Sequence, residues 1–249
     1  MTSLPALPSP ELANEVAALA RAMRRANGPL MAIVNRLGTG MERQLAVLPD
    51  GVRREIARVT EMALHAAHGV AARGAAVGPR GTLAAAVMTG AAGGAGGLAT
   101  SIAELPVTVT VILSAIRAEA FAAGFDPDLP GIRAACLEVF AAGSPLAADD
   151  GVNTSFFSAR LTLTGPALNK LIATIAPKLA AALGQKLAAQ AIPVLGAVTG
   201  AALNAAYLTY YREMARIRFA LMRLTIQHGA ERVMAEFIAA QGAPALSVN

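Results

Sequence analysis

Two long stretches of the sequence carry no charged side chain, and they constrain the fold more than any other feature. Residues 81–103 and 187–211 contain no Asp, Glu, Lys, Arg or His over 23 and 25 positions. A helix that spans a bilayer needs about 20 apolar residues, so both stretches are long enough to enter lipid. Both are rich in Ala and Gly rather than Leu, which equally suits helices buried in a soluble core.

The rest of the chain predicts helices. Apolar residues recur at three- and four-residue spacing and strand-like alternation is nearly absent, so we expect an all-α, multi-helix domain. Its central Ala/Gly-rich helices, near 81–116 and 187–208, should pack together beneath amphipathic helices. The other expected helices are 10–27, 30–48 with a break at Gly38, 52–72, 132–142, 156–186 with breaks near Gly165-Pro166 and Pro177, 214–227 and 231–240.

The domain organisation expected from 249 residues is a Pro-rich lead-in at 1–9, amphipathic helices at 10–76 and a helical region at 77–249 that forms one globular unit with them. The first residues lack the basic and then apolar pattern of a secretory signal, so we expect a cytoplasmic protein. Cys136 is the one cysteine, which excludes an internal disulfide and multi-thiolate metal sites.

The formal net charge of +5 does not predict a nucleic-acid partner, because the chain has no Trp and only 4% aromatic residues for base stacking. A mildly basic surface favours anionic membranes instead. P-loop, GxGxxG and GxSxG motifs are absent, so neither a catalytic residue nor a cofactor is predicted.

Three ordered blocks resemble the EcsC family of bacterial proteins. They are residues 93–108 (GGAGGLATSIAELPVT), 133–140 (RAACLEVF) and 191–198 (AIPVLGAV), with Asn204 beyond the last. The resemblance extends over about residues 81–229. It implies an all-helical cytoplasmic protein, of a family named for a gene beside an ABC transporter, without an agreed activity or catalytic residues to transfer.

Small residues four apart mark the same region, as in the pairs Gly93 with Gly97 and Gly196 with Gly200. Such pairs flatten a helix face so that another backbone approaches closely, in a membrane or in a tightly packed soluble core. A wall of a cavity for a lipid tail is a third interpretation. The candidate ligand or membrane contacts are Gly93, Gly97, Leu98, Glu104, Pro106, Leu195, Gly196, Gly200 and Asn204.

Glu104 is the one ionisable residue between Arg80 and Arg117. An unpaired buried carboxylate is costly, so we expect an ion pair, or an N-cap of a helix that starts at Pro106. An anchor for a ligand headgroup is the alternative. Arg212, Arg216 and Arg218 follow the second uncharged stretch and are candidate contacts for anionic headgroups, or else a solvated basic face.

Glu61, His65 and His68 share one helix face at i, i+4 and i+7 and are the candidate metal ligands. The leading hypothesis is a non-enzymatic protein that binds lipid or another hydrophobic molecule, or associates with the cytoplasmic membrane face, in connection with transport. Its expected partners are therefore lipid, the membrane surface and a membrane transporter. The alternatives are an integral accessory protein of an ABC transporter and a metal-dependent enzyme that uses these three residues.

Overall fold

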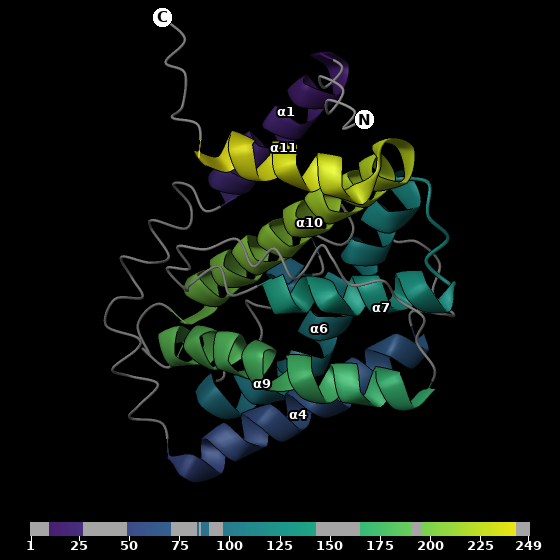
Figure 1. Cartoon of the computed structure of the whole chain (residues 1–249). Helices are drawn as coiled ribbons and strands as arrows, with labels where there is room; N and C mark the ends of the chain where they lie inside the picture. Colours follow the sequence, from purple (N-terminus) through teal and green to yellow (C-terminus); the bar gives the residue numbers. More distant parts are fainter. Residues whose placement is uncertain are drawn as a thin grey trace, which may run out of the picture.

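The computed structural model describes residues 10–26, 49–70, 84, 86–89, 97–142, 165–190 and 196–242, and 94% of these residues are helical (Figure 1). No strand occurs in these ranges, so the all-α prediction is confirmed. The helices are α1 (Pro10–Ala26), α4 (Asp50–Val70), α6 (Gly97–Ala122), α7 (Pro130–Glu138), η1 (Val139–Ala142), α9 (Gly165–Gln190), α10 (Gly196–His228) and α11 (Ala230–Gly242).

Helices α6 and α10 lie at the centre. Helix α6 contacts α4, α10, α9 and α7, and α10 contacts α6, α9, α1 and α11. Near the start of the two helices, Asn204 of α10 donates a hydrogen bond to Glu104 of α6. Further along both helices, Arg212 of α10 donates to Glu119 of α6, so α6 and α10 run in the same direction. The prediction that the two uncharged regions pack together is thus confirmed for α6 and α10.

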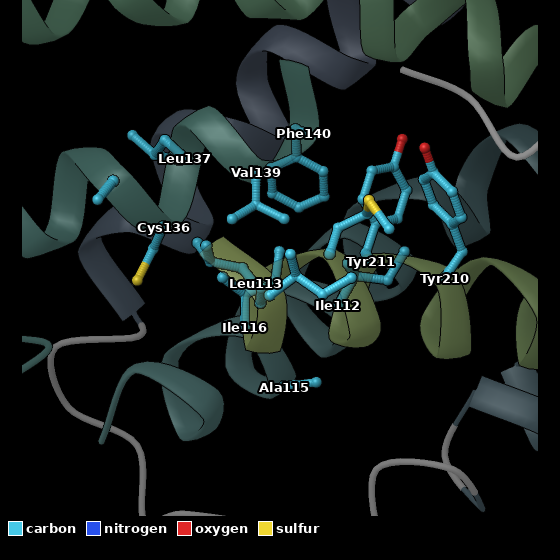
Figure 2. Packing of buried hydrophobic residues seen from close by; sticks show 14 of the residues in the cluster. Ile112, Leu113, Ala115, Ile116, Cys136, Leu137, Val139, Phe140, Tyr210 and Tyr211 are labelled. Carbon is cyan, nitrogen blue, oxygen red and sulfur yellow. The ribbon is translucent and has the colours of Figure 1, made fainter. Parts of the chain in front are cut away.

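The core between these helices is aliphatic at one end and aromatic at the other. Figure 2 shows Ile112 and Ile116 of α6 beneath α7, with Tyr211 of α10 beside Phe140 of η1. The rings of Phe140 and Tyr211 meet edge to face with centroids 5.2 Å apart, a favoured geometry for aromatic pairs. Burial raises the pKa of the Tyr211 hydroxyl well above its ordinary value.

Two proline predictions were wrong. Pro106 was expected to begin a helix and Pro177 to break one, yet each lies inside a continuous 26-residue helix, α6 and α9 respectively. Proline removes one backbone hydrogen bond, which costs a helix interior about 3 kcal/mol. Burial of Leu105 beside the first proline and of Ile175 and Leu179 around the second keeps these helices continuous, since tertiary packing overrides local propensity.

Other boundaries follow the sequence more closely. The helix expected at 132–142 is present as α7 and η1, and α10 and α11 are separated at Gly229, whose φ of +87° suits glycine. The helix expected at 214–227 is the second half of α10 rather than a separate element, because α10 continues without a break from Gly196. The predictions for 30–48 and 156–164 fall outside the described residues.

Candidate functional site

The outer side of α6 is exposed and uncharged over nearly the whole helix. Its exposed or half-exposed positions recur every three or four residues, so they form one stripe. At its two most apolar positions, Val107 is 47% exposed and Phe121 is 73% exposed. The stripe, called the α6 outer face below, consists of Thr100, Ala103, Val107, Thr110, Ser114, Ala118 and Phe121.

Two hydroxyl groups on this face donate hydrogen bonds to backbone carbonyl oxygens of α6 itself. Thr110 Oγ1 donates to the carbonyl oxygen of Pro106 at 2.8 Å, and Ser114 Oγ donates to that of Thr110 at the same distance. A hydroxyl that donates to a backbone carbonyl oxygen in this way does not need to donate a hydrogen bond to water. The α6 outer face therefore presents methyl, methylene and phenyl groups to its surroundings.

The buried part of α6 holds a polar contact with α10. Glu104 is 7% exposed, and its Oε1 accepts hydrogen bonds from Asn204 Nδ2 and Thr108 Oγ1, both at 2.6 Å. Asn204 Nδ2 also donates to the carbonyl oxygen of Ala86 at 3.0 Å. Glu104 is the eighth residue of α6, so its predicted role as an N-cap was wrong. Its contact with Asn204 joins α6 to α10 within the core, and its contact with Thr108 lies within α6.

Two of the three predicted headgroup contacts lie at the surface of α10. Arg212 pairs with Glu119 of α6 at 2.6 Å, and Arg216 pairs with Glu213 one turn away on α10. The hydrogen bond that Arg216 donates to the carboxylate of Glu213 raises the pKa of Arg216. Glu119 is two residues before Phe121, and positions two apart point to different sides of a helix, so the Arg212 pair lies on the side of α6 that faces α10.

Arg218, the third predicted headgroup contact, is buried. Its guanidinium donates to the carboxylate of Glu138 on α7, and Arg218 is only 5% exposed, so its expected place on the surface was wrong. Burial lowers the pKa of Arg218 and raises that of Glu138, while each partner opposes the shift of the other. The neighbouring Cys136 is buried too, which raises its pKa to about 12 and makes the thiol a poor nucleophile at neutral pH.

The other predicted residues are placed only in part. Gly97, Leu98 and Gly196 lie in the first turns of α6 and α10, and Gly200 is buried within α10, whereas Gly93 and Leu195 fall outside the described residues. Glu61 and His65 are exposed on α4, and the side chain of His68 is not among those described. Across the described ranges, no three His, Cys, Asp or Glu side chains are grouped as a metal site would require.

Sequence reasoning missed the α6 outer face, Glu119 and Glu138. The heptad-like spacing of positions 100 to 121 was a usable signal for a continuous stripe. Which side of α6 remains uncovered depends on where α4, α9 and α10 pack, and spacing alone does not give that information.

The sequence matches the family model described as the EcsC protein family over residues 80–224, more than half of the chain. The chain belongs to the EcsC family. The EcsC match includes the whole of α6, α7, η1 and α9 and most of α10, and so both the α6 outer face and the Glu104–Asn204 contact. Helices α1, α4 and α11 lie outside it, although α4 packs directly against α6. No curated protein and no solved structure matches the sequence.

Proposed function

We propose that this EcsC protein is a non-enzymatic protein of the cytoplasmic membrane face that binds a lipid or another hydrophobic molecule along α6. The observation that carries the proposal is the α6 outer face, which is exposed and uncharged from Thr100 to Phe121. A helix of 26 residues is about 39 Å long, enough to lie along an extended acyl chain. Covering an exposed phenyl group such as Phe121 contributes about 1–2 kcal/mol.

The exposed charge pairs of α10 suit a zwitterionic headgroup. Arg212 and Arg216 are 41% and 47% exposed at their side chains, and each has a carboxylate partner. A bound anion would compete with Glu119 and Glu213, whereas a headgroup with both charges finds a donor and an acceptor. The proposal therefore includes contact of the headgroup with Arg212 and Arg216, and excludes Arg218.

A second candidate function is that of an integral accessory protein of a transporter. Thr100–Ala122 is, among the described residues, the one helix long and apolar enough to cross a membrane, with a mean hydropathy of 1.5. Its other side packs against α4, α9 and α10 around the buried Glu104, so spanning would require those contacts to be given up. Alkaline carbonate extraction distinguishes the two, because a peripheral protein is released and a spanning protein stays with the membrane.

The test is native mass spectrometry of protein purified without detergent, with organic extraction of any bound molecule. We expect bound lipid in the wild-type chain and at least about tenfold less in Val107→Asp, because a carboxylate cannot be covered by an acyl chain without a large desolvation cost. The matched control is Ile238→Asp on α11, where the isoleucine is 53% exposed and lies away from α6. Wild-type protein that is soluble and empty would contradict the proposal, as would equal loss in both variants.

A further inference from the structure

The positive charge of the chain is concentrated in one segment. Residues 151–212 contain five of the 21 Lys and Arg residues and none of the 16 Asp and Glu residues. The rest of the chain holds 16 basic and 16 acidic residues and is neutral. The entire formal charge of +5 therefore belongs to a 62-residue segment without a single carboxylate side chain.

Helix α9 lies within this segment and carries all three lysines of the protein, Lys170, Lys178 and Lys186. Its inner residues are apolar and buried, whereas the side chains of Lys170 and Lys178 are exposed, about 12 Å apart along the helix axis. The exposed residues between them are small, which leaves the two ammonium groups as the most prominent features of the surface. These exposed residues, Lys170, Ala173, Thr174, Pro177 and Lys178, are called the α9 outer face.

Lys170 and Lys178 have no counter-charge among the described residues, unlike several arginines at the surface. Arg53 pairs with Asp50, Arg58 with Glu55 and Arg216 with Glu213, each within one turn of the same helix. The side chains of Lys170 and Lys178 form neither an ion pair nor a hydrogen bond with the described residues. The field of the α9 outer face is therefore not cancelled locally and extends over about a Debye length into solvent.

The composition of this face favours a lipid surface over the other large polyanions. Proteins that bind single-stranded nucleic acids stack bases on aromatic and arginine side chains, and the α9 outer face has neither. Lysines with long flexible stems on an amphipathic helix are typical of contact with anionic headgroups, where each contributes independently of exact geometry. The cytoplasmic leaflet is anionic, so its charge is complementary to this face.

We infer that the α9 outer face docks the protein on the anionic headgroups of a phospholipid bilayer, with Lys170 and Lys178 as the principal contacts. This inference rests on the proposed location at the cytoplasmic membrane face. Helix α9 lies in front of α6 in Figure 1 and is in contact with it, and the residues of both outer faces are exposed or half-exposed. Docking through α9 therefore leaves the α6 outer face uncovered and open to its hydrophobic ligand.

The experiment is co-flotation of full-length protein with vesicles of phosphatidylcholine, alone or with about one third phosphatidylglycerol. We expect binding to the anionic vesicles only, and a 10- to 30-fold weaker partition for Lys170→Gln/Lys178→Gln, at roughly fivefold for each charge. Lys170→Arg/Lys178→Arg should bind like the wild type. Arg21→Gln/Arg25→Gln, which makes the same change of net charge at exposed positions of α1, should change the partition less than about twofold.

Equal weakening in the α1 and α9 double variants would overturn the inference, because net charge alone would then explain binding. Equal binding to neutral and anionic vesicles would overturn it as well, as would lysine-dependent binding to an acidic peptide or a single-stranded oligonucleotide without binding to vesicles. The proposed function is tested separately, since lipid that co-purifies with the wild type and is lost in Val107→Asp reports on α6. If the α9 variants bind vesicles like the wild type while Val107→Asp loses the co-purified lipid, the α9 docking surface is rejected and the proposal of a ligand on α6 stands.

Discussion

Helices α6 and α9 have the same length and similar inner sides but opposite outer faces. Each has 26 residues, one internal proline and a buried apolar side in the same core. The α6 outer face carries no charge, whereas the α9 outer face carries two lysines that have no counter-charge among the described residues. The fold requires neither property, because charged side chains at exposed helix positions alter stability little. The comparison teaches that the inner sides of these helices determine the fold, and that the outer faces are free to specify binding.

The largest expected effect tests whether both helices belong to one cooperative core. Arg218→Leu leaves Glu138 buried without its guanidinium partner, at a contact of α10 with α7, which itself touches both α6 and α9. We expect a loss of about 3–5 kcal/mol in the free energy of unfolding at pH 7. The matched control is Arg216→Leu at the half-exposed pair with Glu213, for which a loss below about 1 kcal/mol is expected.

The pH dependence of Arg218→Leu has a defined sign. Burial already raises the pKa of Glu138 in the folded protein, and removal of Arg218 abolishes the opposing attraction, so that pKa rises further. A carboxyl group with a raised folded pKa stabilises the fold in its protonated form and destabilises it as the pH rises through that value. The deficit of the variant relative to wild type should therefore shrink between about pH 7 and about pH 5, measured by urea unfolding. A deficit that grows toward acid would reject this account.

An intermediate effect is expected at the proline of α9. Pro177→Ala restores a backbone hydrogen-bond donor in the helix interior, and the higher helix propensity of Ala favours the folded state by about 3 kcal/mol. The substitution also makes the unfolded chain less restricted, which favours the unfolded state by about 1 kcal/mol. We expect a net stabilisation of about 1–2 kcal/mol in thermal or urea unfolding. Pro166→Ala, in the first turn, should change stability by less than about 0.5 kcal/mol. Destabilisation by Pro177→Ala would show that the proline is needed for the path of α9.

The smallest change in stability is expected when the two outer faces are exchanged. The double variant Val107→Lys/Lys178→Val keeps the net charge and alters only exposed or half-exposed positions, so unfolding should shift by less than about 0.5 kcal/mol. Binding should change strongly, with loss of the co-purified lipid and weaker flotation with anionic vesicles. If the variant keeps its stability, its co-purified lipid and its flotation with anionic vesicles, the two outer faces do not differ in what they bind.

Much of the fold was accessible from the sequence because helical periodicity is a local signal. The 3.6-residue pattern located α1, α4 and α11 within a few residues, and the blocks around Glu104 and Cys136 carried the EcsC resemblance. Pro177 was misjudged for the complementary reason. Local rules count its missing hydrogen bond, and they do not count the burial of Ile175 and Leu179 that outweighs it.

The candidate site was less accessible, because it depends on partners distant in sequence. Arg218 resembled a surface arginine until Glu138, 80 positions earlier, was found beside it. The role of Asn204 likewise depends on Glu104, 100 positions away. The lysines of α9 illustrate a different limit, since their unusual feature is an absence of carboxylates over 62 residues, and a search for motifs does not detect what is missing.

The contact between the first and last described helices affects how the chain matures during synthesis. Helix α1 buries Leu12, Val16 and Leu19 and packs against α10 and α11. Arg24 of α1 donates a hydrogen bond to the carbonyl oxygen of Ala240, 216 positions later. A nascent chain emerging from the ribosome must therefore carry the apolar side of α1 uncovered until α10 and α11 have been translated. Among the described helices, the synthesis of α11 completes the cover over the apolar side of α1.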